Sequence, residues 1–262
     1  MEIIGYTLSI FIGITLGLIG AGGSILTVPV LVYLFHIHPT LATSYSLFIV
    51  GFTSLIGSFL KIKENGVDYS AATYFGISSV FVILIVRKVL LVHIPEIILQ
   101  THHFQLTKST ITMIAFAVLM LGASWSMIKN KQIQVSTNHP TKQPITKMIL
   151  WGIGIGLVTG FLGAGGGFLI IPALVILLRM PIRIAIGTSL SIITLNSLIG
   201  FLGDIDHVQM DWFFLVKLLS ITILGVAIGN YLQKKIATDK LKPIFGWFIF
   251  FVGTYILIKE LF

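Results

Sequence analysis

The chain has 262 residues, of which 56% are hydrophobic and only 10% are charged, and its mean hydropathy is +1.02. This composition excludes an ordinary soluble domain and predicts a protein that crosses a membrane several times. The absence of cysteine excludes a disulfide framework, a thiolate metal site and a cysteine nucleophile. The formal net charge of +8 resides on lysines and arginines in the breaks between apolar segments, which indicates contact with anionic lipid headgroups and no nucleic-acid partner.

Apolar segments that approach the length of a membrane span, about 20 residues, recur along the whole chain. The first of them lacks a basic start and a cleavage site, so we expect it to remain as a helix. Arg87 and Lys88 are assigned to a break between two spans. The predicted fold is an all-α polytopic membrane protein with about eight transmembrane helices. The expected spans are Ile3 to Gly20, Leu41 to Leu60, Ala71 to Val86, Ser109 to Ile128, Met148 to Leu162, Ile184 to Leu202, Trp212 to Leu232 and Ile244 to Ile258.

The sequence contains two similar stretches at an offset of 143 residues. "GLIGAGGSILTVP" begins at Gly17 and "GFLGAGGGFLIIP" begins at Gly160, and the aligned glycines and proline exceed what apolar composition produces by chance. We therefore expect two homologous repeats of about four helices each, over residues 1–128 and 148–262. The polar, basic residues 129–147 between them are expected to form an exposed linker. The sequence leaves open whether the repeats run parallel or inverted.

Each repeat carries a glycine-rich break within an apolar segment. The piece after the first break, Ser24–Phe35, is about 18 Å of helix, so we expect a half-helix or a re-entrant segment near the centre of the membrane. A helix that begins at Ser24 directs free N–H groups toward the break, where glycine allows an anion to approach the backbone. The alternative is that the glycines only allow close helix packing. The residues of the breaks expected at this anion site are Gly22, Gly23, Ser24, Gly165, Gly166 and Gly167.

Hydroxyl and amide side chains follow each break and complete the expected site. Such groups hold an oxyanion without carrying a charge, although in membrane helices they usually bond back to their own helix or to a neighbour. The two halves are not equivalent, because "SYSL" at Ser44–Leu47 stands where the second half has "GTSL". We therefore expect binding to depend more on the second repeat. The side chains expected at the site are Ser46, Thr188, Ser189 and Asn196.

Several charged residues admit two interpretations. Lys217, a few residues into its span, either supplies a positive charge to an anion or extends to the membrane interface. Asp204 and Asp206 follow a helix end, and Asp211 and the related Asp68 are expected to cap the next helices, with proton coupling as the alternative. No metal site is expected. With the histidines in loops an intramembrane protease lacks its base, so we expect no enzyme. The histidines expected in loops are His36, His38, His93, His102 and His103.

The paired motifs, together with "GTSL" at Gly187–Leu190 and "SLIG" in both halves, resemble the TauE/SafE family of sulfite-exporter-like membrane transporters. The resemblance covers nearly the whole chain. It implies transport of a small sulfur-containing or carboxylated oxyanion, such as sulfite, thiosulfate, a sulfonate or sulfoacetate, through the cytoplasmic membrane without ATP. We expect a secondary transporter whose two repeats move around a shared central site, with no cofactor.

Two other functions stay open at this point. One is a gradient-driven anion channel of the same fold, and the other is a membrane partner protein that transports nothing. The sequence also leaves open the direction of transport, the coupling proton or other ion, and the oligomeric state, including a homo-oligomer.

Overall fold

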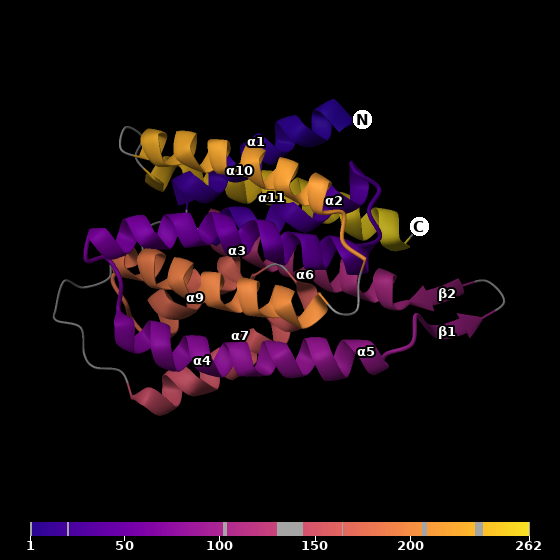
Figure 1. Ribbon diagram of the computed structural model, residues 1–262, viewed down its shortest axis with the longest axis horizontal. Helices are drawn as coiled ribbons and strands as arrows, with labels where there is room; N and C mark the ends of the chain where they lie inside the picture. The colour runs from indigo at the N-terminus through magenta and orange to yellow at the C-terminus, as the bar shows by residue number, and fades with distance from the viewer. Residues whose placement is uncertain are drawn as a thin grey trace.

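The computed structural model describes residues 2–19, 21–101, 104–129, 144–163, 165–205, 209–233 and 238–261. Most helices run along the longest direction of the molecule (Figure 1). Among the described residues, seven helices are long and apolar enough to cross a membrane, so the expected all-α polytopic membrane fold is confirmed. These seven are α3 (Pro39–Lys63), α4 (Tyr69–Ile85) with its extension η2 (Val86–Leu90), α6 (Lys108–Lys129), α7 (Ile145–Leu162), α9 (Ile182–Asp204), α10 (Trp212–Gln233) and α11 (Thr238–Leu261).

The remaining elements are short or belong to the ends of longer helices. The first expected span forms α1 (Glu2–Ile19), whose apolar stretch Ile4–Leu18 is shorter than the seven spans. After η2 the chain continues through α5 (Leu91–His93) into an antiparallel hairpin of β1 (Ile97–Thr101) and β2 (Phe104–Thr107). The hairpin extends from one end of the helix bundle (Figure 1).

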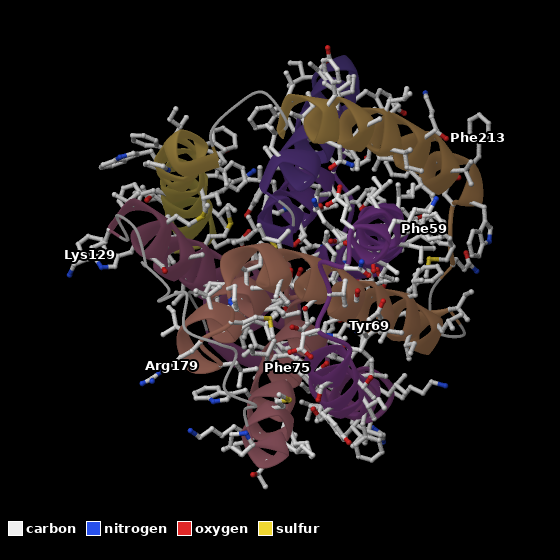
Figure 2. All side chains as sticks on the ribbon, turned by 90° about the vertical axis from the view of Figure 1, so that its left-hand side faces the viewer. Phe59, Tyr69, Phe75, Lys129, Arg179 and Phe213 are labelled. Atoms are coloured by element: carbon white, nitrogen blue, oxygen red, sulfur yellow. The ribbon has the colours of Figure 1, made fainter. Side chains whose placement is uncertain are left out.

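Helices α3 and α9 form the centre of the bundle. Of their apolar windows, 61% and 67% of the residues are buried, compared with 28–39% in the other five spans. Figure 2, which looks along the bundle, shows them surrounded by the other helices, with Lys129 and Arg179 at the rim. The two helices run antiparallel, because Ser58 Oγ lies 2.7 Å from Ser191 Oγ near one end while Ser44 donates to Asp204 near the other. This central pair therefore carries the polar side chains of both halves into the interior.

Glycines bring the outer helices close together. A β-carbon added at Gly13 of α1 would lie 2.8 Å from the α-carbon of Gly225 on α10, and one at Gly17 would lie 2.9 Å from that of Gly229. On the other side of the bundle, a β-carbon at Gly156 of α7 would lie 2.9 Å from the α-carbon of Ser79 on α4. Small residues at four-residue spacing allow this approach in membrane helices. Helix packing thus accounts for Gly17, although not for the glycines that follow α7.

The two halves of the described chain run in opposite directions (Figure 1). Helices α1 and α10 are parallel, as are α4 and α7, whereas α3 and α9 are antiparallel. Since α3 and α4 run in opposite directions, as do α9 and α10 (Figure 1), helices α1, α3 and α4 oppose α7, α9 and α10, their counterparts at the 143-residue offset. The division into residues 1–128, 129–147 and 148–262 stays a prediction, and residues 130–143 of the linker lie outside the described residues.

The segment after the first break turns back toward the end of the bundle from which α1 entered. The short helices η1 (Ala21–Leu26) and α2 (Thr27–Tyr33) follow α1, and a β-carbon at Gly23 would lie 2.6 Å from the backbone nitrogen of Leu16. Beyond α2, the ring of Phe35 contacts Tyr6 near the start of α1 at 5.2 Å between centroids. The segment is therefore re-entrant.

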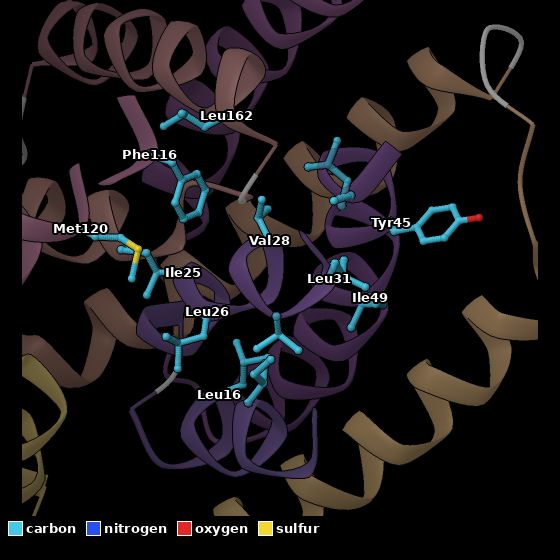
Figure 3. Packing of buried hydrophobic residues seen from close by; sticks show 14 of the residues in the cluster. Leu16, Ile25, Leu26, Val28, Leu31, Tyr45, Ile49, Phe116, Met120 and Leu162 are labelled. Atoms are coloured by element: carbon cyan, nitrogen blue, oxygen red, sulfur yellow. The ribbon is translucent and has the colours of Figure 1, made fainter. Parts of the chain in front are cut away.

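Buried apolar side chains hold this re-entrant segment in place. Ile25 and Leu31 are fully buried, and they pack in a cluster that includes Phe116 and Met120 of α6 (Figure 3). In the second half, α8 (Gly167–Pro172) and η3 (Ala173–Leu177) occupy the corresponding place in the chain. Both halves thus insert a short, non-spanning helical piece into the centre of the bundle.

Candidate functional site

The two glycine-rich breaks lie side by side in the interior, where η1 contacts α8. We call η1 the first break and residues 163–167 the second break; Ala164 of the latter lies outside the described residues. In the second break Gly163, Gly165 and Gly166 have φ angles between 65° and 67°. Only glycine adopts this left-handed conformation without steric cost. The second break therefore requires its glycines for the backbone itself.

The first break has a different backbone from the one expected. Ser24 lies inside a 3-10 helix that starts at Ala21, and the α-helix begins only at Thr27, so the predicted helix start at Ser24 is wrong. The chain tightens into a 3-10 turn and continues as a helix. No residue in the described part of η1 adopts a positive φ. In the second break, by contrast, α8 begins at Gly167 directly after the left-handed Gly166. Gly22 lies in the same 3-10 helix, one residue after Ala21.

Helices α3, α7 and α9 line the second break. A β-carbon at Gly165 would lie 2.6 Å from Ser197 Oγ on α9 and 2.9 Å from Val50 on α3, and one at Gly166 would contact Thr159 Oγ1 on α7. Ser46 lies one helical turn before Val50 on α3, so it shares the face that meets the break. The structure thus places Ser197, which is not among the predicted site residues, against Gly165. The role of Ser46 at the site stays a prediction.

Several polar side chains around the breaks are buried and make no hydrogen bond within the part of the chain that the structure describes. A buried polar group without a partner costs about 1–3 kcal/mol, so native proteins keep few of them outside functional sites. Two of them, on Thr159 and Ser197, lie next to backbone that only glycine can form, which indicates a place where something other than protein supplies the partners. The hydroxyl and amide atoms of this kind are Oγ1 of Thr27 and Thr159, Oγ of Ser46, Ser54 and Ser197, and Nδ2 of Asn196.

Three of the predicted hydroxyl and amide residues have partners within the protein. Thr188 Oγ1 accepts a hydrogen bond from the backbone N–H of Asp68 at 2.9 Å, and Ser189 donates to the carbonyl of its own helix residue Ile186 at 2.8 Å. Asn196 accepts from Ser79 through its oxygen at 2.7 Å, while its Nδ2 is one of the atoms without a described partner. Thr188 and Ser189 are therefore occupied by the fold in this state.

Asp68 and Asp211 cap helices, as the sequence predicted. Asp68 Oδ1 accepts from the backbone N–H of Ala71, and Asp211 Oδ1 accepts from that of Phe214, each at 3.0 Å. The backbone N–H of Asp211 also donates to the hydroxyl of Tyr45 at 2.8 Å, which mirrors the bond between Asp68 and Thr188 at the 143-residue offset. Each cap thus also ties one half of the chain to the other.

Lys217, another suspected charged residue, packs against α1 at the surface. Lys217 is exposed, and its Nζ lies 4.3 Å from the centroid of the Tyr6 ring, which agrees with a side chain that extends to the interface. Asp206, His102 and His103 lie outside the described residues. The described residues contain no group of three or more histidine, cysteine, aspartate or glutamate side chains placed to hold a metal ion.

A buried ion pair, Arg87 with Asp204, was missed by the sequence-based prediction. Arg87 was assigned to a break, but the helix continues through it and leaves its side chain only 2% exposed, so that assignment is wrong. Its Nη1 pairs with Asp204 Oδ2, which also accepts from the hydroxyl of Ser44, and its Nε donates to the carbonyl of Gly160 at 2.9 Å. The available signal was the apolar sequence on both sides of the Arg87–Lys88 pair, because a charge inside a span is a functional suspect.

The ion pair lies against the second break. A β-carbon at Gly163 would contact both Nη2 of Arg87 and the side chain of Thr43. That Nη2 atom is buried and has no hydrogen-bond partner among the described residues. A cation that cannot lose its proton thus presents unused N–H donors to the backbone of the break.

Comparison with known proteins shows the family to which the chain belongs. The family described as "Sulfite exporter TauE/SafE" matches residues 6–256. The chain is 26% identical to the "Probable membrane transporter protein YunE" of Bacillus subtilis, over 97% of both chains. It is 29% identical to the "Probable membrane transporter protein YdhB" of the same organism, over 83% of this chain and 84% of the relative. It is also 23% identical to the "Probable membrane transporter protein MJ0441" of Methanocaldococcus jannaschii, over 94% and 92%. No solved structure shows significant similarity to the chain.

Proposed function

We propose, since the chain belongs to the sulfite exporter TauE/SafE family, that this multi-pass membrane transporter is a secondary carrier of a small oxyanion. The substrate class is a small sulfur-containing or carboxylated oxyanion, such as sulfite, thiosulfate, a sulfonate or sulfoacetate. The single observation that carries the proposal is the set of buried hydroxyl and amide groups without described partners around the glycine breaks. Such groups donate hydrogen bonds to oxyanion oxygens, and because they are neutral they also allow release.

The proposed site lies between the two breaks and the central helices. Its core is formed by the backbone of Gly165 and Gly166, the hydroxyls of Ser46 and Ser197, and Nδ2 of Asn196. Gly167 continues this backbone into α8. The first break contributes Gly22, Gly23 and Ser24 from the opposite side, since η1 contacts α8. Thr188 and Ser189 belong to the site only in a state in which they release their present partners.

The opposite directions of the two halves support transport by alternating access. Carriers built from oppositely oriented halves place the substrate at the interface of the halves near the bilayer midplane, and expose it to each side by moving one half against the other. Here the central helices α3 and α9 come from different halves and carry the hydroxyls of the proposed site. A rocking motion between them changes access to the site without dismantling either half.

Removal of single hydroxyls tests this proposal. Ser46→Ala and Ser197→Ala each delete a hydroxyl that has no described partner, so neither change should lower the thermal unfolding midpoint. If the hydroxyls hold the substrate, the KM for sulfite in proteoliposomes should rise about threefold to tenfold in each variant. The matched control is Ser124→Ala in α6, which removes a buried hydroxyl bonded to its own helix at Leu121.

The outcomes separate a binding role from a structural one. Sulfite is the first probe, followed by thiosulfate, sulfoacetate and acetate. A raised KM in both site variants with normal kinetics in the control supports the proposed site. Unchanged kinetics in both site variants contradict it, and a wild-type protein that carries none of the four anions contradicts the proposed substrate class.

A further inference from the structure

The guanidinium of Arg87 is only partly used by the fold. One of its nitrogens, Nη1, pairs with Asp204, and Nε donates to the carbonyl of Gly160 at 2.9 Å. The third nitrogen, Nη2, carries two N–H donors and has no hydrogen-bond partner among the described residues, although it is buried. Arginine does not lose its proton inside proteins, so these donors cannot be made harmless by deprotonation. Burial of unused donors on a cation is costly unless a ligand takes them up.

The free nitrogen of Arg87 borders the second break, the same turn of backbone that forms part of the proposed oxyanion site. Nη2 faces Gly163, and Ser197 faces Gly165. Two residues of chain span at most about 7 Å between α-carbons, so the guanidinium and the Ser197 hydroxyl border the same short piece of backbone. Both positions are left-handed glycines, so neither of these two residues places a side chain between the guanidinium and the hydroxyl. A small oxyanion in contact with this turn meets a cation on one side and a hydroxyl on the other.

We infer that Arg87 binds the transported oxyanion through Nη2, and that Asp204 and Ser44 hold its guanidinium in position. This inference rests on the proposed function and adds a charged residue to a site otherwise made of neutral groups. A planar guanidinium presents its donors in a fixed fork that matches an oxyanion. The carboxylate of Asp204 neutralises the cation when the site is empty, which allows the charge to remain buried between transport cycles.

The Arg87–Asp204 pair also makes the two halves of the proposed site unequal in charge. Arg87 and Asp204 correspond, at the 143-residue offset, to Asn230 and Lys61, which form no such pair among the described residues. Ser44, which donates to Asp204, corresponds to Gly187. Within the described ranges, the charged contact therefore lies beside the second break alone. The oxyanion contacts Arg87 on the side of the site that faces the C-terminal ends of α4, α7 and α9.

The test uses the whole chain in a neutral detergent, so that no anionic lipid headgroup competes for the arginine. The double variant Arg87→Gln with Asp204→Asn removes both charges together, because removal of one alone leaves the other buried without compensation. We expect it to unfold near the wild-type temperature and to bind sulfite about ten- to a hundredfold more weakly by calorimetry. Arg87→Lys keeps a charge beside Asp204 but has no second nitrogen, and we expect about tenfold weaker binding.

The matched control removes the ion pair at the related position of the first half. Lys61 lies 2.8 Å from Glu64, so Lys61→Gln with Glu64→Gln deletes one pair without touching the second break. Sulfite affinity should not change in this control. Normal affinity in both Arg87 variants means that the pair is structural only, and overturns the inference while the proposed function stands. A wild-type protein that binds neither sulfite, thiosulfate nor sulfoacetate overturns both.

Discussion

The two breaks have nearly the same sequence but differ in backbone and in charge. The first forms a continuous 3-10 turn, whereas the second has three glycines in the left-handed conformation. A buried arginine contacts the second break at Gly163, and the residue related to it in the other half is Asn230. The positions related to Asp204 and Ser44 are Lys61 and Gly187. A shared scaffold thus carries two chemically different breaks.

This difference shows where the two kinds of glycine in the motif act. Gly17 and Gly160 lie at the packed surfaces of α1 and α7, where any side chain would strike a neighbouring helix. Gly163, Gly165 and Gly166 instead shape the chain itself. A single glycine-rich motif therefore serves helix packing at its start and a left-handed turn at its end, and only the second half shows that turn among the described residues.

The largest effect on transport is expected from Gly166→Leu, which places a side chain at a left-handed position of the second break. Leucine at a φ of 67° is strained, and its β-carbon meets Thr159. We expect sulfite transport in proteoliposomes to be abolished, together with a lower thermal unfolding midpoint, while the protein still inserts into the membrane. The comparison variant is Gly154→Leu in α7, which has open space around it.

That comparison variant should transport sulfite at the wild-type rate and unfold at the wild-type temperature. Normal transport by Gly166→Leu would show that the turn has no part in the transport cycle. The same result would leave the difference in backbone between the two breaks without a role in transport.

The next effect in size concerns the stability of the charged pair. Asp204→Asn leaves Arg87 as an uncompensated buried charge, so we expect the free energy of unfolding to fall by about 3–5 kcal/mol. Lys61→Gln, at the related position of the first half, breaks a partly exposed pair and should cost no more than about 1 kcal/mol. Titration with a denaturing detergent measures the loss of unfolding free energy in each variant. Equal losses would mean that Asp204 does not compensate a buried charge.

Much of the scaffold could be predicted from sequence, because membrane spans depend on local composition. Seven of the eight expected spans coincide with spanning helices of the structure. The re-entrant piece after Ser24 was predicted because it is too short to cross a membrane, and the caps at Asp68 and Asp211 because capping involves residues three positions apart. Each of these features is settled within a few residues of chain.

The missed features depend on contacts between distant residues. Whether Arg87 ends a span or points inward is decided by α7 and α9, which lie far along the chain. Whether Thr188 is free is decided by the turn before α4. The start of α2 was misplaced because the same glycine motif allows either a 3-10 turn or a left-handed turn. Hydroxyls suitable for a site are recognisable in sequence, but their partners are fixed only when the two halves pack together.

The smallest effects are expected at the two caps, where the halves are most alike. Asp68→Ala and Asp211→Ala each remove one acceptor for a helix N–H, so each should lower the free energy of unfolding by about 1 kcal/mol. Asp68→Asn and Asp211→Asn retain a capping oxygen and should lose less. Transport per folded molecule should be unchanged in all four variants, because the caps lie in the connections before α4 and α10. A carboxylate that couples proton movement would behave differently, since the asparagine variant would stay folded but lose the pH dependence of sulfite uptake. That result at either position would replace capping with proton coupling, and would show that the halves also differ where their hydrogen bonds are the same.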